Sequence, residues 1–367
     1  MKIVFRTDAS IQTGTGHVMR CLTLADALRE RGAQCTFVCR PHAGHLLDLI
    51  RQRGHEALGL RLPEAQFNAP ADPTHAQWLG TGWASDAEQT RQALGDHAVD
   101  WLVADHYALD RRWEQSMRPH AKNIMVIDDL ADRPHDCDLL LDQNLGRAAA
   151  DYSGLLNPGT QTLIGPQYAL LRPEFAQWRD YSLKRRVNPQ LKNLLITMGG
   201  VDKDNATGQV LQALRTCPLP LDCRITVVMG ATAPWLDEVR TQAQDMPWPT
   251  RVLVGVNDMA QLMADSDLAI GAAGSTSWER CCLGLPTLMV VLAENQKEAA
   301  AHLQKAGAAN YLKFSGLLHR DLHDHLQCLI DHSEQLGEMA ACASAITDGL
   351  GVECMVDAMK MSPDKNI

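Results

Sequence analysis

The first residue of this chain that could do chemistry is His17, which closes the run Gly14-Thr15-Gly16-His17. A histidine exchanges protons near neutral pH, so His17 is predicted to be a catalytic general base or a donor to a ligand hydroxyl or phosphate. The two glycines let the backbone approach a ligand closely, and Gly16 is predicted to bind substrate. The alternative is a histidine at the start of a helix that merely lies near a turn.

Further polar residues in the first half follow segments that are predicted to be strands. Asp105-His106-Tyr107 ends an apolar run, and Asp8 lies in the first loop. Because parallel strands end at one edge of a sheet, all four are expected near His17 and are predicted to bind substrate. Asp105 could orient His17 or hold a sugar hydroxyl, and Asp8 could hydrogen-bond His17. The alternative for the triplet is a polar strand end that caps the next helix.

Two groups of neighbouring carboxylates raise the question of a metal ion. Asp128-Asp129 ends another predicted strand, but adjacent strand residues point to opposite faces, so one of the two is expected to cap a turn or helix. The sequence Asp265-Ser266-Asp267 precedes a strand, which puts it at the edge opposite the predicted site. We interpret it as a helix end and a strand start. No metal site and no cofactor are predicted.

In the second half, the sequence GAAGST at positions 271–276 follows a predicted strand and opens a predicted helix. Free N–H groups at such a start favour anions, so Gly274, Ser275 and Thr276 are predicted to contact a phosphate. Glu279, one turn into the helix, suits bonding to two vicinal ribose hydroxyls, although its place also suits the helix dipole.

A second glycine pair ends the first predicted strand of this half, in Met198-Gly199-Gly200-Val201-Asp202. Gly199 and Gly200 let the backbone approach a pyrophosphate or a bound sugar, and both are predicted substrate contacts. The alternative, which the motif favours when taken alone, is a tight turn followed by a helix N-cap.

These residues need a scaffold in which strands alternate with helices, and the sequence predicts it twice. In the first half, strands are predicted at 2–6, 35–39, 101–105, 124–128 and 138–141, with helices at 18–31, 44–53, 86–94 and 109–118. In the second half, strands are predicted at 191–198, 224–229, 251–254, 268–271 and 287–292, with helices at 205–217, 234–245, 258–264, 275–283 and 297–306. The stretch 62–81 is interpreted as a long loop or insertion.

The polar and basic stretch at 178–190 is interpreted as a linker between the two halves. We therefore predict an α/β protein with two Rossmann-like domains that face one another across a cleft. Residues 1–180 form the domain that carries His17, and residues 190–315 form the nucleotide-binding domain. A helical C-terminal tail is predicted at 316–367.

Composition narrows the function classes. The 367 residues carry a net charge of −10 with no block of Lys or Arg, which disfavours nucleic acid as a partner. No apolar run is long enough to span a membrane, and no leader peptide is expected. The 11 cysteines are an odd number and scattered, which is typical of reduced core thiols, so a cytoplasmic protein is expected.

Taken together, several of these motifs resemble the PseG family, the UDP-2,4-diacetamido-2,4,6-trideoxy-β-L-altropyranose hydrolases of pseudaminic acid biosynthesis. The resemblance spans residue 1 to about residue 313 and does not include the tail. The motifs that carry it are Arg6-x-Asp8, Gly14-x-Gly16-His17, Asp105-His106-Tyr107, Asp128-Asp129, Tyr168-Ala169-Leu170-Leu171-Arg172, Met198-Gly199-Gly200-x-Asp202 and Glu294-Asn295-Gln296.

The resemblance implies a GT-B architecture similar to MurG and metal-independent hydrolysis that releases UDP and 2,4-diacetamido-2,4,6-trideoxy-L-altrose. Water would attack the anomeric carbon with inversion, and His17 would act on that water. Glu279 would bind the uridine ribose, the turn at 274–276 the pyrophosphate, and Arg172 a phosphate or the sugar. The motif positions Asn295 and Gln296 would contact substrate.

Three other functions stay open at this point. The first is a GT-B glycosyltransferase that uses a UDP-sugar donor. The second is a nucleotide-sugar-binding or regulatory protein without turnover. The third is an NAD-dependent enzyme, which is disfavoured because the first loop lacks the G-x-G-x-x-G spacing. The partners expected are a small UDP-sugar and water, and no oligomer is predicted.

Overall fold

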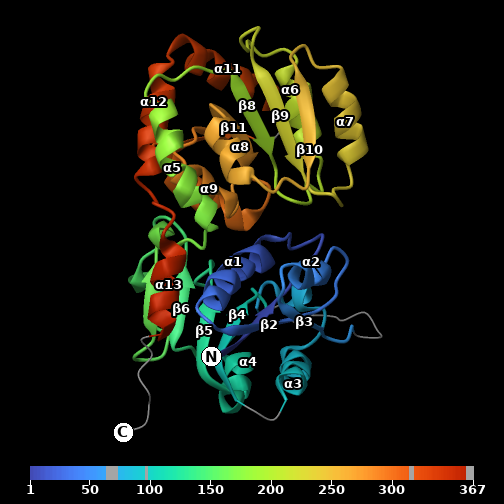
Figure 1. Cartoon of the computed structure of the whole chain (residues 1–367), viewed down its shortest axis with the longest axis vertical. Helices are drawn as coiled ribbons and strands as arrows, with labels where there is room; N and C mark the ends of the chain where they lie inside the picture. Colours follow the sequence, from blue (N-terminus) through green and yellow to red (C-terminus); the bar gives the residue numbers. More distant parts are fainter. Residues whose placement is uncertain (63–72, 96–97, 314–317, 361–367) are drawn as a thin grey trace. The chain divides into compact units, whose positions relative to one another are not determined.

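The computed structural model describes residues 1–62, 73–95, 98–313 and 318–360. The chain divides into two compact units. Unit 1 comprises Met1–Leu170 together with the helix that begins at Gly351, and unit 2 comprises Leu171–Leu350. Each unit contains one parallel β-sheet with helices packed on it (Figure 1).

The sheet of unit 1 has seven parallel strands in the order β3-β2-β1-β4-β5-β6-β7. Its strands are β1 (Lys2–Thr7), β2 (Gln34–Cys39), β3 (Glu56–Gly59), β4 (Val99–Asp105), β5 (Ala121–Ile127), β6 (Leu139–Asp142) and β7 (Gln161–Ile164). Its helices are α1 (Gly16–Glu30), α2 (Leu47–Gln52), α3 (Trp83–Leu94), α4 (Arg111–Met117) and α13 (Gly351–Lys360), with short 3-10 turns η1 (Ala76–Leu79), η2 (Arg118–His120), η3 (Ala149–Tyr152) and η4 (Pro166–Tyr168).

Successive side chains along each strand of unit 1 point to opposite faces of the sheet, and a hydrophobic core lies on each face. In β1, Ile3 and Phe5 join the cluster under α1, α2 and α13, whereas Val4 joins the cluster that contains Trp113 of α4. Because successive strand residues point to opposite faces, a strand buried on both sides is apolar throughout. The helices thus cover both faces, and the strand ends are left to carry polar residues.

The sheet of unit 2 has six parallel strands in the order β10-β9-β8-β11-β12-β13. Its strands are β8 (Asn193–Thr197), β9 (Arg224–Met229), β10 (Thr250–Val254), β11 (Leu268–Ala272), β12 (Thr287–Val290) and β13 (Ala309–Leu312). Its helices are α5 (Pro173–Arg185), α6 (Ala206–Leu214), α7 (Leu236–Gln244), α8 (Met259–Asp265), α9 (Thr276–Cys282), α10 (Lys297–Lys305), α11 (Leu318–Asp331) and α12 (Glu334–Ser344), with the 3-10 turn η5 (Glu294–Gln296).

The predicted linker is helical in the structure, because α5 runs through most of it and packs on α8 and α9 within unit 2. The arginines of this segment make contacts within unit 2, which residues of a solvent-exposed linker would not do. Arg186 is buried and donates hydrogen bonds to the carbonyl oxygens of Met263, Ser266 and Leu283, at the ends of α8 and α9. Helix ends leave carbonyl groups without partners, and a guanidinium satisfies several at once.

The C-terminal region is helical, and its helices divide between the two units. Helices α11 and α12 belong to unit 2, where α11 packs on α6, whereas α13 belongs to unit 1, where it packs on α1 (Figure 1). The indole N–H of Trp101 donates to the carbonyl oxygen of Met359 in α13 at 3.1 Å. The strands β3, β7 and β13 were not expected from the sequence, and the expected insertion at 62–81 lies partly outside the described residues.

Candidate functional site

The strand order of each sheet reverses at one point, and the predicted site residues follow the strands that meet there. In unit 1, β1 lies between β2 and β4, so the loops after β1 and β4 leave toward opposite faces and open a crevice between them. In unit 2, β8 and β11 hold the same positions. Ligands of open α/β sheets bind at such switch points, at the carboxyl ends of the strands.

His17 of unit 1 lies in the first turn of α1, after a loop that closes on itself. The backbone groups of Ser10 and Gly14 pair with one another, and Gly14 has a φ of 76°, in the left-handed region that glycine tolerates. The loop thus ends in a tight turn that starts α1 directly at the sheet edge. This geometry places His17 beside the residues that follow β4.

The imidazole of His17 is bonded to Asp105. Its Nδ1 lies 2.6 Å from Asp105 Oδ1, and Asp105 is completely buried. An ionised carboxylate only accepts hydrogen bonds, so in the neutral ring the proton is on Nδ1 and Nε2 carries the lone pair. Nε2 has no hydrogen bond partner among the described residues. This contact matches one of the two roles considered for Asp105, the orientation of His17, and it leaves Nε2 able to accept a proton.

Arg20 fixes the carboxylate that holds His17. Its Nε and Nη2 donate to the two oxygens of Asp105 at 2.7 and 2.6 Å, and its Nη1 donates to Asp129 at 2.7 Å. Burial disfavours the charged form of Asp105, but the positive charge of Arg20 and the hydrogen bonds from Arg20 and His17 outweigh it and hold the pKa of Asp105 well below its usual range. Asp105 is therefore ionised at any pH at which the protein would work.

Tyr107 and Asp129 complete this group. The Tyr107 hydroxyl donates to Asp129 Oδ2 at 2.9 Å, and the Tyr107 ring meets the His17 ring edge-on with 4.6 Å between centroids. Burial and the charge of Asp129 raise the pKa of Tyr107 well above its ordinary value, so its hydroxyl stays protonated and donates. The two carboxylates, the arginine and the tyrosine hold His17 from one side.

Asp8 and His106 belong to a separate, buried group. Asp8 accepts both Nη atoms of Arg6 at 2.7 and 2.9 Å and the backbone N–H of Arg40 at 2.6 Å. His106 accepts from Ala108 N at Nδ1, which puts the ring proton on Nε2, 3.3 Å from Asp8 Oδ2. Within the described residues, the hydrogen bonds of His17 do not include Asp8, so the expected bond between them is absent. Asp8 instead anchors the end of β1 to the end of β2.

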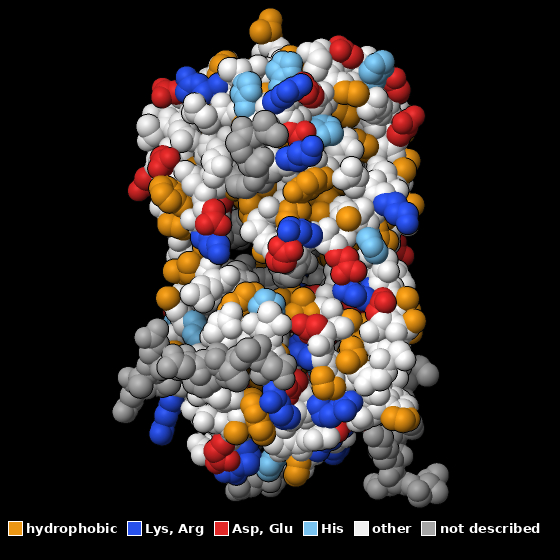
Figure 2. Space-filling model, turned by 180° about the vertical axis from the view of Figure 1, so that it is seen from behind, with side chains coloured by type: hydrophobic (Ala, Val, Ile, Leu, Met, Phe, Trp, Pro, Cys, Tyr) orange, Lys and Arg blue, Asp and Glu red, His pale blue; other side chains and the backbone are white. Residues whose placement is uncertain are grey.

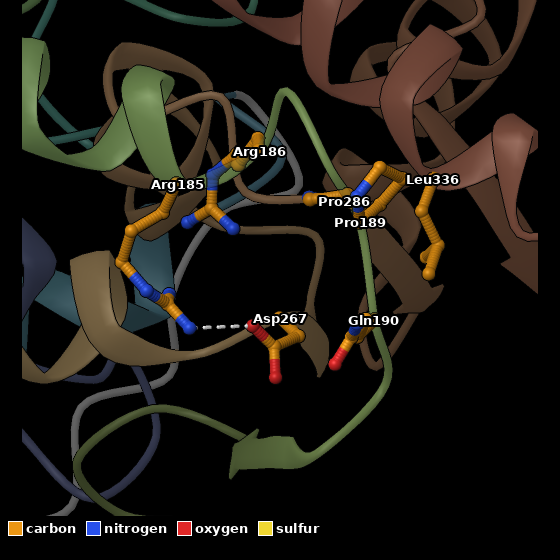
Figure 3. Close-up of a pocket in the computed structure, with 7 residues that line it drawn as sticks. All are labelled: Arg185, Arg186, Pro189, Gln190, Asp267, Pro286 and Leu336. Carbon is orange, nitrogen blue, oxygen red and sulfur yellow. Dashed lines mark hydrogen bonds and ion pairs between the residues drawn. The ribbon is translucent and has the colours of Figure 1, made fainter.

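The neighbouring carboxylates of both groups have partners within the protein. Asp128 accepts the backbone N–H of Ala131 and pairs with Arg133, so it caps a turn as expected, while Asp129 points to the Arg20 group. Asp267 accepts the N–H of Asn193 at 2.8 Å and pairs with Arg185 (Figure 3). It lies between the end of α8 and the start of β11, which confirms its interpretation. The described residues contain no cluster of three or more potential ligand side chains.

In unit 2, the turn after β11 exposes the predicted anion contacts. Ser275 is exposed and Gly274 and Thr276 are half-buried, and the Ser275 side chain makes no capping bond to the helix that follows. The N–H groups of Gly274 and Ser275 have no acceptor among the described residues. These N–H groups are thus available to an anion.

A buried arginine that was not predicted holds this turn from behind. Arg280 donates to the carbonyl oxygen of Ala272 at 2.8 Å, to Ser277 Oγ at 3.0 Å and to Thr276 Oγ1 at 3.2 Å. No carboxylate of the described residues forms an ion pair with it. Burial lowers the pKa of Arg280 to about 10, so it is still charged at neutral pH. A positive charge therefore lies directly beneath the exposed turn.

Glu279 and Arg172 lie on the same side of unit 2. Burial raises the pKa of Glu279, and the positive charge of Arg172 is the strongest effect that opposes the rise. The Glu279 carboxylate has no hydrogen bond partner in the described part of the chain. Arg172 is the N-cap residue of α5 and pairs with Glu174 at 3.1 Å. A partly desolvated carboxylate without a partner is costly in free energy unless a ligand supplies donors.

Other residues of unit 2 that were predicted to contact substrate also have partners within the protein. Gln296 accepts the backbone N–H of Leu292 at 2.9 Å, so it organises the turn after β12, and the side chain of Asn295 lies outside what the structure describes. Gly200 approaches Gly230 so closely that a Cβ on Gly230 would lie 1.9 Å from the Gly200 carbonyl oxygen. Asp202 accepts the N–H groups of Ala206 and Thr207 at the start of α6, and Asn205 is the N-cap, so the turn and cap of the alternative interpretation are present.

Sequence reasoning missed two positively charged residues that the structure places at these sites. Arg20 lies three residues after His17 and therefore on the same face of α1, and Arg280 lies four residues after Thr276 on α9. Helical spacing from a candidate residue was thus an available signal for both. Figure 2 shows Lys and Arg interspersed with Asp and Glu among the described residues of the drawn face, without a continuous basic patch. Within the described ranges, no helix has the length and apolarity needed to cross a membrane.

Comparisons with known proteins agree with this architecture. Residues 195–351 match the model of the glycosyltransferase family 28 C-terminal domain. The chain is 26% identical over 308 residues to a UDP-2,4-diacetamido-2,4,6-trideoxy-beta-L-altropyranose hydrolase of Campylobacter jejuni, covering 84% of this chain and 97% of that protein. It is 25% identical over 334 residues to an uncharacterized protein of Methanocaldococcus jannaschii, covering 88% of this chain but only 63% of that relative.

Among solved structures, MurG of Acinetobacter baumannii is similar, with a TM-score of 0.66 at 20% identity over 98% of this chain and 99% of MurG. At this level of identity the likeness concerns the fold. Each of the two α/β units of this chain contains one parallel sheet, and the strand order of each sheet reverses at one point. The chain has the GT-B fold.

Proposed function

We propose that this chain is an enzyme that hydrolyses a UDP-sugar and releases UDP and 2,4-diacetamido-2,4,6-trideoxy-L-altrose. The observation that carries the proposal is the bond from His17 to the buried Asp105, which leaves Nε2 of His17 without a protein partner among the described residues. Similarity over nearly the full length of the C. jejuni hydrolase supports the choice of substrate.

In the proposed reaction, His17 Nε2 accepts a proton from a water molecule whose oxygen attacks the anomeric carbon. The bond from that carbon to the UDP oxygen breaks, and UDP leaves with the electron pair. The attack inverts the anomeric configuration. Asp105 stabilises the positive charge that forms on His17, as a buried carboxylate does for a catalytic histidine. No metal ion takes part, and a base of this kind contributes about 10²- to 10⁴-fold in rate.

Unit 2 supplies the contacts to the leaving group in this proposal. The turn at 274–276 and Arg172 contact the pyrophosphate, the positive charge of Arg280 lies behind that turn, and Glu279 binds the ribose. Fixed donors that face a developing negative charge lower the barrier because they need no reorganisation during the reaction. A glycosyltransferase with a UDP-sugar donor is the alternative, which the domain match at residues 195–351 keeps open.

The test is incubation of the protein with the UDP-diacetamido sugar alone, followed by NMR of both products. We expect UDP and the free sugar in equal amounts without any acceptor, with the inverted anomer formed first. Strict dependence on an added acceptor would favour the transferase. His17→Ala should abolish turnover and keep UDP binding, and His120→Ala is the matched control, because His120 precedes β5 at the other edge of the sheet. Equal activity of the two variants would contradict the role of His17.

A further inference from the structure

A chain of aromatic rings extends from His17 to a segment that the proposed reaction does not use. The Tyr107 ring contacts the His17 ring, and its centroid lies 5.5 Å from that of His75 and 5.8 Å from that of Trp78. The rings of His75 and Trp78 stack on one another at 4.2 Å. Four rings therefore form one contiguous group with the candidate base at its end.

The segment that carries His75 and Trp78 is anchored by its other residues. Ala76 and Leu79 of η1 are buried, and Leu79 joins the hydrophobic cluster that contains Trp113. His75 and Trp78 are instead half-exposed. A core-packing role would bury the largest ring of the segment and expose the smaller residues. Here Ala76 and Leu79 are the buried residues, and the rings of His75 and Trp78 keep part of their surface accessible, so the aliphatic side chains hold the segment in place.

The polar atoms of these two rings are also without partners. Neither the indole N–H of Trp78 nor the imidazole of His75 forms a hydrogen bond within the described residues. By contrast, the indoles of Trp101 and Trp113 donate to Met359 and Asp86. A half-exposed aromatic wall with free donors next to a candidate base has the composition of a ligand pocket, which is mostly apolar with a few polar groups.

We propose that His75 and Trp78, backed by the buried ring of Tyr107, form the wall of a sugar subsite beside His17, which binds the apolar groups of an N-acetylated 6-deoxy sugar. The inference rests on the proposed function and names the residues that select the sugar. The C6 methyl and the acetamido methyl groups pack on the ring faces, and the free indole N–H is available to an acetamido carbonyl oxygen. A hydroxylated C6 would lose the methyl contact.

The size of the effect follows from general measurements on apolar pockets. One methylene in a hydrophobic pocket changes substrate discrimination by about 10- to 200-fold. Removal of the Trp78 ring should therefore raise KM for the 6-deoxy diacetamido substrate by at least about 10-fold. The Kd for UDP should stay within about twofold, because the proposed nucleotide contacts are in unit 2. A residue that only supports folding would instead lower the fraction of active protein and leave KM unchanged.

The experiment compares Trp78→Ala, Trp78→Leu and His75→Ala with the wild type. Trp83→Ala is the matched control, because Trp83 lies in the same unit and contacts Arg112 rather than the rings near His17. The readouts are KM and kcat for the UDP-sugar, Kd for UDP, and saturation-transfer NMR on the free diacetamido sugar. We expect raised KM and lost transfer to the methyl groups in the Trp78 variants, with Trp83→Ala unchanged.

Wild-type KM and wild-type saturation transfer in Trp78→Leu would overturn the subsite. The NMR arm also separates this inference from the proposed function. If the wild type hydrolyses no UDP-sugar, the hydrolase proposal fails, and the subsite is then decided by the free sugar alone. Transfer that Trp78→Leu abolishes supports the subsite, and absence of transfer to the wild type refutes it.

Discussion

Replacement of Asp105 by Asn tests how the structure makes His17 a base. The carboxylate accepts from Arg20 through both oxygens and from His17 through Oδ1. An amide supplies only one accepting atom. If its oxygen faces His17, its NH₂ opposes the donor Nε of Arg20. If it is flipped, its NH₂ faces His17 Nδ1, and the ring proton must move to Nε2. Either arrangement removes a bond, and the second also blocks the base.

The expected loss has a stability part and a catalytic part. Breaking a buried ion pair costs about 3–5 kcal/mol, and the lower end applies because Arg20 keeps its bond to Asp129. A loss of about 3 kcal/mol lowers Tm by roughly 6–12 °C for a unit of this size. The catalytic part is a fall in kcat of about 10²- to 10⁴-fold, because the imidazole loses its orientation and the partner of its positive charge.

The assay measures Tm by calorimetry and kcat for UDP-sugar hydrolysis well below that Tm. Asp110→Asn is the control, because Asp110 is also buried and pairs with Arg112, and it caps α4 away from His17. We expect Asp110→Asn to lose some stability with unchanged kcat. If Asp105→Asn loses the expected stability but keeps kcat within about twofold of the control, Asp105 only supports Arg20, and the orientation argument is wrong.

The other predictions concern charged groups whose pKa the fold displaces. Because burial raises the pKa of Glu279, Glu279→Gln should raise Tm at neutral pH and weaken UDP binding about 10- to 100-fold by calorimetry. Unchanged UDP affinity would exclude the ribose contact. Arg280→Met should weaken UDP binding about tenfold and leave uridine binding unchanged, and an equal loss for both ligands would show a general collapse of the turn. Burial and the charge of Asp129 raise the pKa of Asp142 to about 7. An acid with a raised folded-state pKa loses stability as pH rises from about 4 to 7, so the Tm of Asp142→Asn relative to wild type should increase over this range and then level off. A constant difference from pH 4 to 8 would contradict this assignment.

The sequence predicted most of the scaffold because the periodicity of its segments is strong. Strands such as β1 and β8 contain an unbroken apolar run, Ile3–Phe5 and Leu194–Ile196, and are followed by helices with regular spacing. The strands β3, β7 and β13 are only four residues long, and all three lie at sheet edges, so their patterns are too short to separate from loops. The segment of α5 was predicted to be a linker because it is polar and basic. Its arginines in fact donate hydrogen bonds to carbonyl oxygens that are distant in the sequence.

The candidate site was predictable where a residue lies at a strand end, and not where it depends on tertiary contacts. His17 and Asp105 are separated by 88 residues, yet strand order alone places both at one edge. Nothing in the sequence indicates that His75 and Trp78 lie near His17, because their segment has neither helical nor strand periodicity in its apolar residues. Asp8 was predicted to contact His17 from its position in the loop, but Arg6 lies two residues earlier on the same strand face and takes both of its oxygens.

The position of His17 also depends on the far end of the chain. Helix α1 carries His17 and Arg20 on one side, and buried residues of α13, Val352 and Met355, join the hydrophobic cluster on the side where Leu22 lies. The exposed rim of this contact is held by an ion pair of Arg31 with Glu353. A helix that begins at a tight glycine turn has few local constraints on its axis, so packing must supply them. The C-terminal helix, although it follows unit 2 in sequence, is therefore part of the support that fixes the candidate base.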